Sequence, residues 1–412
     1  MTDTTLVEAV APEGAAPTGS AAARERFAPL FERIAADAAR REREHELPTA
    51  LVRGLADAGF GALRLPVSAG GSGLTFAELG ELLVELAAAD SNLPQIFRGH
   101  LAFVEDRLAA PPSASRDAWL ARFAAGEVVG NAWSETGPVT LGESGTRVRR
   151  TSGGVLLSGR KFYTTGSLYA DWIDATATDE DGNAVTVLVR VDQPGVTVSD
   201  DWDGFGQQLT GTGTAVFANA VVEPENVFRF EDRFRYQTAL YQWTLVSVLA
   251  GIAQAVEREA GAALRARTRV YSHGLAPLAK DDGQLQAVIG EISATAFTAR
   301  ALVRSVSDAL DAAAATAAQR DSAEDVEANV RAEIASAQAQ IALSQAVPVA
   351  ATRLFDTLGA SAVSRSAGLD RHWRNARTVA SHNPWVYKAR IVGDWSVNGT
   401  APTPIWHVGT SR

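Results

Sequence analysis

One histidine stands in a setting where acid–base chemistry is possible. His382 lies in the run Ser381-His382-Asn383-Pro384, and because proline disfavours helical backbone in the residue before it, we expect a loop there. A histidine on a loop beside small polar side chains can take up or release a proton during a reaction. The alternative is a loop histidine that only bonds to nearby backbone, which is the common role of a lone histidine.

Two further clusters combine aromatic side chains with small hydroxyl groups at the expected ends of strands. They are Asn131-Ala132-Trp133-Ser134-Glu135-Thr136 and Lys161-Phe162-Tyr163-Thr164-Thr165-Gly166-Ser167. A planar heterocycle such as an isoalloxazine ring needs an apolar surface to stack on and hydrogen-bonding groups at its edge. Either cluster alone is more typical of an ordinary sheet terminus, but the two together predict a cofactor site of this kind.

A run of arginines offers a third kind of chemistry. Arg265, Arg267 and Arg269 follow one another near the end of a long expected helix. A solvated helix end, where cations offset the helix dipole, competes with a role in holding phosphate, for which the arginine fork is well suited. The glycine cluster at 70–73 lacks the strand and the GxGxxG spacing of a dinucleotide site, so we expect no nicotinamide site in this chain.

The elements that must position these residues change in type along the chain. Apolar residues recur at helical spacing before about 126, alternate in the middle of the chain, and return to helical spacing after about 231. Strands are expected at 155–163, 171–177, 184–190 and 214–221, and long helices at 236–268, 284–318 and 324–347. The expected domains are a flexible lead-in (1–20), an N-terminal helical domain (21–126), a central β domain (127–230) and a C-terminal helical bundle (231–412). The missing alternation of strand and helix disfavours a doubly wound sheet.

Composition narrows the class of protein. The 412 residues carry a formal net charge of −10, which argues against a surface for nucleic acid or an anionic membrane. The absence of cysteine excludes disulfides, thiolate catalysis and cysteine-ligated metals, and we expect no metal site. No uninterrupted apolar stretch of about 18 residues is present, and the opening residues lack a signal pattern. We therefore expect a soluble, cytoplasmic protein.

These clusters, in this order, resemble the acyl-CoA dehydrogenase superfamily over nearly all of 25–400. The most specific stretch runs from Gly359 to Arg377 and ends Asp370-Arg371-His372-Trp373-Arg374-Asn375-Ala376-Arg377. It is similar to the superfamily's glycine-rich turn and the Arg-x-x-Arg-Asp-Ala-Arg helix that follows, with the same spacing. The resemblance implies a mainly helical fold with an N-terminal helical domain, a central β-barrel domain and a C-terminal four-helix bundle.

Two departures from the dehydrogenase pattern bear on function. Dehydrogenases of this superfamily commonly carry a catalytic glutamate six residues after the last arginine of that motif, and here the position is Asn383. A minority carry it in the first long helix of the bundle, where this chain has Tyr241-Gln242-Trp243-Thr244 and no carboxylate. Asparagine has no basic form that could remove the α-proton of a thioester, so dehydrogenation is not expected.

The chain is most similar to the flavin-dependent monooxygenase branch of the superfamily, and within it to the dibenzothiophene monooxygenases. Matching stretches are Phe97-x-x-His100-Leu101, Gly130-Asn131-Ala132-x-Ser134-Glu135, Asp200-Asp201-Trp202, Val222-Glu223-Pro224, Trp373-Arg374-Asn375 and Tyr387-Lys388. The resemblance implies a two-component homotetrameric enzyme, in which a separate NAD(P)H-dependent flavin reductase supplies FMNH2 or FADH2 and O2 is the co-substrate. A C4a-hydroperoxyflavin would then oxygenate an organosulfur, heteroaromatic or nitrogen-containing small molecule of the indole or thiophene type.

The same resemblance implies the site residues. Those implied in catalysis are His382, His100, Asn131 and Ser134. Those implied in cofactor binding are Asn131, Trp133, Ser134, Thr136, Tyr163, Thr164, Thr165, Arg269, Ala360 and Ser361. Arg269 would hold the flavin phosphate, which the turn at 360–361 would approach from a neighbouring subunit. The implied substrate pocket contains Gln95, Trp133, Tyr163 and Asn383.

Three positions differ from the dibenzothiophene monooxygenases. Gln95 stands where they have a second active-site histidine, Gly99 replaces a flavin-contacting tyrosine, and Ser361 replaces an arginine at the phosphate end. The first disfavours dibenzothiophene itself as the substrate, and the other two leave FMN and FAD open. The alternatives are an acyl-CoA dehydrogenase with a non-standard base, and a non-catalytic protein that kept the fold for partner binding.

Overall fold

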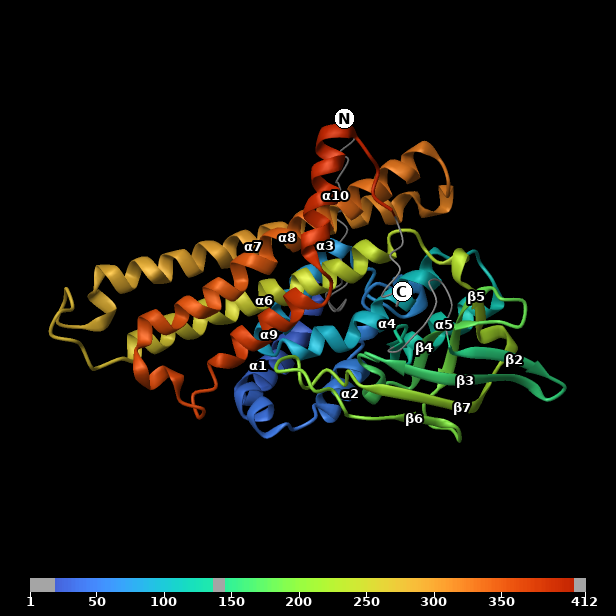
Figure 1. Ribbon diagram of the computed structural model, residues 1–412, viewed down its shortest axis with the longest axis horizontal. Helices are drawn as coiled ribbons and strands as arrows, with labels where there is room; N and C mark the ends of the chain where they lie inside the picture. Colours follow the sequence, from blue (N-terminus) through green and yellow to red (C-terminus); the bar gives the residue numbers. More distant parts are fainter. Residues whose placement is uncertain (1–18, 136–144, 404–412) are drawn as a thin grey trace, which may run out of the picture.

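The computed structural model describes residues 19–135 and 145–403. Helices come first along the chain, strands fill the middle, and long helices form the last part (Figure 1). The β domain lies at one end of an elongated helical bundle, and the N-terminal helices pack between the two (Figure 1). The fold class predicted from the sequence is confirmed.

The N-terminal part contains one helix that the sequence analysis misses. Its helices are α1 (Ser20–Glu44), α2 (Thr49–Asp57), α3 (Phe76–Ala89), α4 (Asn92–Ala109) and α5 (Ala114–Ala124). Every residue of α4 from Asn92 to Arg107 is buried. A helix that is covered on all sides shows no alternation of polar and apolar faces, so α4 carries no amphipathic signal in its sequence.

The central domain is a mixed sheet. Its strands are β1 (Val129–Ala132), β2 (Arg147–Thr151), β3 (Gly154–Phe162), β4 (Trp172–Thr178), β5 (Ala184–Arg190), β6 (Val196–Val198), β7 (Thr214–Val222) and β8 (Val227–Arg229). The order is β6-β7-β3-β2-β4-β5-β8, with β1 parallel to β4 so that Asn131 lies opposite Asp174. The strand path is open at β6 and β8, but the sheet curls around one apolar core. Strands β2, β6 and β8 are too short to show alternation, and the prediction lacks them.

The last part is the bundle of α6 (Gln237–Ala266), α7 (Gly283–Thr316), α8 (Ala323–Leu358), α9 (Asp370–Ser381) and α10 (Trp385–Asn398). Helix α8 continues past its predicted end at 347, through Pro348, because buried residues such as Ala351 and Leu354 keep its inner face packed. By length and composition alone α6 could cross a membrane, but 94% of its most apolar window is buried in this fold. That is the position of a core helix.

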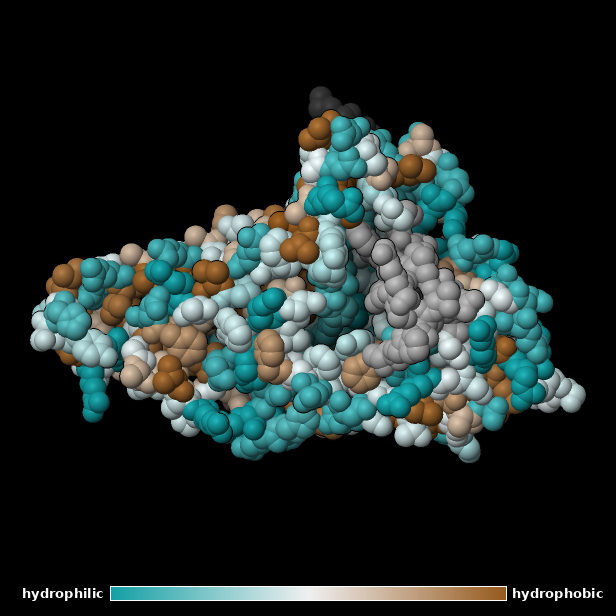
Figure 2. All heavy atoms as spheres, viewed as in Figure 1, coloured by the Kyte–Doolittle hydropathy of each residue, from teal (hydrophilic) through white to brown (hydrophobic). Residues whose placement is uncertain are grey.

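The two ends of the bundle differ in what they contact. One end meets the β domain, while the α6–α7 connection and the segment between α8 and α9 lie at the opposite end (Figure 1). Helix α10 projects from the side of the bundle, and the surface is hollowed beside its base (Figure 2). The turn from α9 to α10, which contains His382 and Asn383, lies at this base.

Candidate active site

The two predicted clusters meet at the edge of the sheet. The backbone N–H of Asn131 donates to the carbonyl of Thr165 at 3.3 Å, and that of Phe162 donates to the carbonyl of Ser134 at 3.0 Å. The end of β1 and the loop after β3 are thereby held side by side. Thr136, also expected in this site, lies outside the described residues.

The loop after β3 uses its hydroxyl groups internally. Oγ1 of Thr164 donates to the carbonyl of Gly213 at 3.0 Å, and Oγ1 of Thr165 lies 2.7 Å from Oγ1 of Thr212. Tyr163 has a positive φ of 65° and is 46% exposed. Left-handed backbone is uncommon outside glycine and marks a constrained turn. This loop therefore offers a rigid backbone edge, and the Tyr163 ring points to the surface.

Helix α4 packs closely against both segments. A Cβ atom added at Gly99 would lie 2.8 Å from Cβ of Asn131, and one at Gly166 would lie 2.4 Å from the carbonyl oxygen of Ile96. A tyrosine at position 99 therefore cannot fit here without moving β1. The close approach sets one face of α4, with Gln95 and Arg98 three residues apart, beside the ends of the strands.

Four side chains from separate segments form an arginine–aromatic row: Arg233, Trp133, Tyr241 and Arg98. The Trp133 ring lies 4.7 Å from the guanidinium carbon of Arg233 and 5.6 Å from the Tyr241 ring. The centre of the Tyr241 ring also lies 5.0 Å from the guanidinium carbon of Arg98. Such cation–ring contacts are favourable, more so when they are shielded from water. Burial raises the pKa of Tyr241 to about 12, so its hydroxyl stays protonated.

His382 meets the open end of this row. The residue as a whole is exposed, but Nε2 of its ring lies 3.2 Å from Nη2 of the buried Arg98. Because a guanidinium can only donate, Nε2 must accept and the ring proton must sit on Nδ1. Desolvation of the ring where it packs against its neighbours, and next the charge of Arg98, lower the pKa of His382 to about 3. The imidazole is therefore neutral at physiological pH.

Several buried polar atoms in this region have no hydrogen-bond partner among the described residues. They are Oε1 of Gln95, Nε of Arg98, Oδ1 of Asn131, Oη of Tyr241, Oδ1 of Asp174 and both Nη atoms of Arg233. Buried polar groups in folded proteins nearly always have partners, so a group of orphans requires an explanation. Donors and acceptors next to aromatic rings suit the edge and face of a flavin together with a small substrate. The residues present fit such a cofactor.

His100 has a different environment from the one expected of a catalytic residue. Its side chain is fully buried, Nε2 lies 3.0 Å from the carbonyl oxygen of Gly61, and Nδ1 accepts from the backbone N–H of Val129 at 3.1 Å. Burial lowers the pKa of His100 to about 4. Both ring nitrogens are thus used to join α4 to β1 and to the turn Phe60–Ala62, and we give His100 a structural role instead.

Carboxylates are scarce around the row. Within the described residues, Asp174 is the acidic side chain that contacts it, since Nε1 of Trp133 donates to Oδ2 of Asp174 at 3.3 Å. The same oxygen lies 3.1 Å from Nη1 of Arg233, and Asp174 is fully buried. Dehydrogenases carry their glutamate at one of two places, and neither holds a carboxylate here. One is Asn383, and the other is the stretch 241–244, whose Tyr241 belongs to the row. The Asn383 carbonyl accepts from Nε2 of Gln340 at 3.1 Å.

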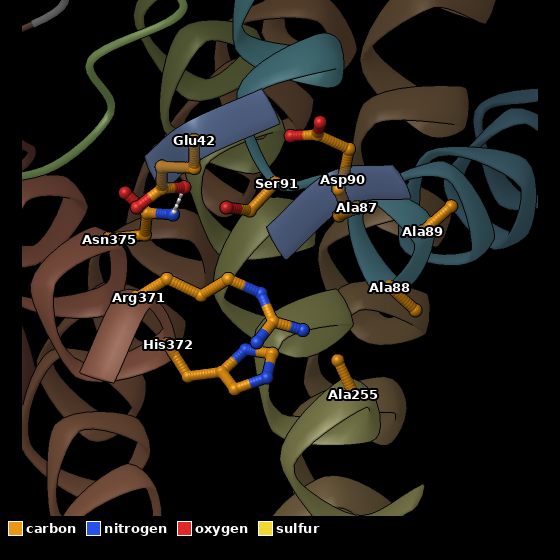
Figure 3. Close-up of a pocket in the computed structure, with 11 residues that line it drawn as sticks. Glu42, Ala87, Ala88, Ala89, Asp90, Ser91, Ala255, Arg371, His372 and Asn375 are labelled. Carbon is orange, nitrogen blue, oxygen red and sulfur yellow. Dashed lines mark hydrogen bonds between the residues drawn. The ribbon is translucent and has the colours of Figure 1, made fainter. Parts of the chain in front are cut away.

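A separate polar cluster fixes the helix that precedes His382. Nδ2 of Asn375 donates to Oε2 of Glu42 at 2.7 Å (Figure 3). Arg371 and His372 lie 2.5 and 3.1 Å from the carboxylate of Glu259. Burial alone would raise the pKa of Glu259, but His372 and Arg371 lower it to about 2. These bonds tie α9 to α1 and α6, so the most specific motif in the sequence is used to anchor the α9–α10 turn.

The predicted phosphate residues lie away from this site. Arg269 is exposed in the α6–α7 connection, and Ala360 and Ser361 are in the short helix Ala360–Val363 after α8. A Cβ atom at Gly359 would lie 3.1 Å from Oη of Tyr271, so these two segments are neighbours. Both are at the end of the bundle opposite the β domain (Figure 1). One chain therefore does not bring Arg269 to the Asn131 cluster.

Comparison with known proteins adds independent information. The model for the acyl-CoA dehydrogenase N-terminal domain matches residues 21–127, and that for the C-terminal domain matches residues 243–385. Among curated proteins, the probable FMNH2-dependent monooxygenase SfnC of Pseudomonas putida is 26% identical over 92% of this chain and 95% of its own length. Dibenzothiophene monooxygenase of Rhodococcus qingshengii is 26% identical over 91% of this chain and 93% of its own.

Solved structures give the same grouping. TdsC of Paenibacillus sp. A11-2, solved with FMN and indole, has a TM-score of 0.83 and 27% identity over 93% of this chain and 98% of its own. Methanesulfinate monooxygenase MsuC of Pseudomonas fluorescens has a TM-score of 0.82 and 28% identity over 92% of this chain and 98% of its own. The resemblance stated from the sequence is confirmed. The chain belongs to the acyl-CoA dehydrogenase family, in its branch of flavin-dependent monooxygenases.

Proposed function

We propose that this chain is the oxygenase of a two-component system. A separate NAD(P)H-dependent reductase supplies FMNH2, and the oxygenase uses O2 to place one oxygen atom on a small organic substrate while the other leaves as water. The use of FMN is supported by relatives described as FMNH2-dependent or solved with FMN. The need for a reductase is supported by the absence of a GxGxxG dinucleotide motif from the sequence.

The observation that carries the proposal is the missing base. Removal of a thioester α-proton requires a carboxylate with a free lone pair, and neither Asn383 nor the stretch 241–244 supplies one. Asp174 is committed to Arg233 and to Trp133 within the fold. A site with rings and orphaned polar atoms but no available base is suited to oxygen transfer rather than to dehydrogenation.

The residues of the site divide the work between binding and orientation. Asn131, Ser134 and the backbone edge at 163–165 would hold the flavin, and Trp133 would give it an apolar surface. Reduced flavin, when bound, supplies the electrons that activate O2. The buried row and α4 exclude water from the reacting atoms. His382 donates its Nδ1 proton to the side chain of Asn383 and orients Arg98 through Nε2.

Oxygen transfer is tested by isotope incorporation. The purified protein is mixed anaerobically with FMNH2, then with isotope-labelled O2 and a panel of small organosulfur, nitrogen and carboxylate compounds, and products are analysed by mass spectrometry. We expect one labelled oxygen atom per product molecule, dependent on FMNH2 and unaffected by NADH without a reductase. A parallel series with FADH2 in place of FMNH2 shows which of the two flavins supports oxygen incorporation.

The competing activity has its own signature. An acyl-CoA dehydrogenase bleaches its bound oxidised flavin when an acyl-CoA is added without oxygen. Bleaching of that kind, with no labelled product from any compound, would replace the monooxygenase proposal with the dehydrogenase one. A protein that binds neither oxidised nor reduced flavin would be the non-catalytic relative.

Assembly follows from the position of the predicted phosphate residues. Because Arg269 and the turn at 360–361 lie at the far end of the bundle, they could reach a flavin in the Asn131 cluster only from another copy of the chain. Large apolar side chains on α7 and α8 are also exposed, with Phe297 at 76% and Val349 at 60%. We therefore include a homotetramer in the proposal. Light scattering of Arg269→Met should show an unchanged assembly, and titration should show weaker FMN binding.

A further inference from the structure

All but one of the buried lysine and arginine side chains in the described residues pair with a carboxylate. Among the described residues, six lysines and arginines are at most 9% exposed: Arg41, Arg98, Arg107, Lys161, Arg233 and Lys388. Five of them have a carboxylate oxygen at 2.5 to 3.1 Å, in the pairs Arg41–Asp90, Arg107–Asp106, Lys161–Glu135, Arg233–Asp174 and Lys388–Glu333. Arg98, which is 6% exposed, has no carboxylate partner among the described residues. The fold otherwise neutralises the positive charge that it buries.

The neighbours of Arg98 do not replace a counterion. Nη2 donates to the neutral His382 at 3.2 Å, and the guanidinium lies 5.0 Å from the uncharged ring of Tyr241. Nε is buried and has no acceptor. An isolated charge costs several kcal/mol to move out of water, and a guanidinium cannot neutralise itself by losing its proton near pH 7. An anion that binds next to Arg98 would offset the cost of burying its charge.

The position of Arg98 identifies what can bind. Its helix α4 passes beside Asn131, and its guanidinium ends the row that contains Trp133, so it lies next to the residues proposed to hold the flavin. Gln95 lies one helical turn earlier on the same face, with a buried Oε1 that also lacks a partner. The planar fork of arginine matches a group with two equivalent oxygen atoms, such as a carboxylate or a sulfinate.

We propose that Arg98 is the counterion for an oxyanion carried by the substrate, so that this enzyme acts on small organic anions, carboxylates or sulfinates, rather than on neutral heteroaromatic compounds. His382 holds the guanidinium in place from one side, and the anion takes the remaining N–H groups. The inference rests on the proposed function for the reaction that follows, but the binding it describes takes place without turnover.

The test compares anions with neutral molecules of the same shape. Benzoate against benzamide, and benzenesulfinate against methyl phenyl sulfoxide, are titrated calorimetrically into the protein with oxidised FMN present and absent. We expect at least one anion to bind ten-fold or more tightly than its neutral counterpart, and the two pairs distinguish carboxylate from sulfinate. Equal binding within both pairs would overturn the proposal, whatever the outcome of the oxygen-incorporation experiment.

Variants assign the preference to Arg98. In Arg98→Met the preference for the anion should disappear while the affinity for the neutral molecule stays within two-fold, and Arg98→Lys should retain part of it. The matched control is Arg304→Met, which removes an arginine that is exposed on α7. An anion preference that survives in Arg98→Met contradicts the proposal. So does a variant whose only defect is weaker binding of reduced FMN, since the anion at Arg98 would then be the flavin.

Discussion

The two arginines of the arginine–aromatic row have the same kind of neighbours and opposite electrostatic situations. Both are buried and both lie over an aromatic ring, Arg233 over Trp133 and Arg98 over Tyr241. Arg233 has Asp174 at 3.1 Å, whereas Arg98 has only His382. The charge at the Arg233 end of the row is neutralised within the chain, whereas the charge of Arg98 is not neutralised by any described residue. A buried charge with a counterion in the chain stabilises the fold, while a buried charge without one indicates where a charged ligand binds.

Histidines show the same contrast. His100 has a backbone partner on each ring nitrogen, whereas His382 uses Nε2 for the buried cation Arg98 and lies in the turn between α9 and α10. We call Arg233 and His100 the satisfied side of the site, because the chain supplies a counterion for the first and a hydrogen-bond partner on each ring nitrogen of the second. Arg98 and His382 form the unsatisfied side. Substitutions on the satisfied side should cost stability, and those on the unsatisfied side should cost ligand binding.

The largest expected effect is on the satisfied end of the row. Arg233→Met leaves the fully buried Asp174 without its counterion, which should lower the free energy of unfolding by about 3 to 5 kcal/mol. In Arg98→Met the same change removes an unneutralised charge, so stability should stay the same or rise. Urea unfolding of both variants measures the difference. Equal losses in the two would show that Arg98 is balanced inside the chain.

The next effect concerns the satisfied histidine. His100→Gln keeps a donor for Gly61 but leaves the Val129 N–H without its acceptor, at a cost of about 1 to 3 kcal/mol. Because the pKa of His100 falls from 6.5 to about 4 on folding, the unfolded chain binds more protons between these values and the parent loses stability as the pH falls. The gap between parent and variant should therefore narrow from pH 7 to pH 5. A gap that widens would mean that His100 is charged in the folded protein.

A substitution at the junction of α4 and β1 should lower both the stability of the protein and its affinity for FMN. In Gly99→Ala the new Cβ would lie 2.8 Å from that of Asn131, and relieving such an overlap costs about 1 to 3 kcal/mol. The shift falls on Asn131, so FMN should bind more weakly than in the parent while the anion preference at Arg98 is kept. Gly290→Ala on α7, where an added Cβ meets no atom within 4 Å, is the matched control. Normal FMN affinity in Gly99→Ala would remove Asn131 from the flavin site.

The smallest effect is expected at His382. His382→Gln retains an acceptor for Arg98 and should weaken anion binding by about 1 kcal/mol or less, whereas His382→Leu should cost about 1 to 3 kcal/mol because a buried donor loses its partner. Since the pKa of His382 is lowered to about 3, its charge does not change between pH 5 and pH 8. Anion binding by the parent should be flat over this range. A step near pH 6.5 in the parent, absent from the glutamine variant, would contradict the neutral ring.

The sequence predicts those parts of the site that depend on local pattern. Strand ends with a hydroxyl next to an aromatic residue are visible at 131–134 and 163–165, and the structure places them together. The long helices and the order of the domains follow from the apolar spacing. The strands β2, β6 and β8 and the continuation of α8 beyond Pro348 depend on packing with distant segments, which spacing does not show.

The sequence shows that Arg98 has no acidic neighbour nearby, but it does not show that Arg98 is buried. It lies between Phe97 and Gly99 in a segment with no acidic residue before Glu105, which is a signal that a buried cation lacks a local partner. Because α4 is covered on every side, its sequence shows no helical period, and the burial of Arg98 cannot be predicted from the spacing of apolar residues. The family resemblance implies a catalytic role for His100, and the sequence shows nothing against it because its two partners, Gly61 and Val129, are distant in sequence.

The most direct test is a crystal structure of the protein with FMN and the anion that binds most tightly in the titrations. The account predicts that the two oxygen atoms of the anion lie about 2.7 to 2.9 Å from nitrogen atoms of Arg98, the range of charge-assisted hydrogen bonds, with the flavin beside Asn131 and Trp133. A structure in which a carboxylate of the protein assembly pairs with Arg98, and the anion binds elsewhere, would contradict it.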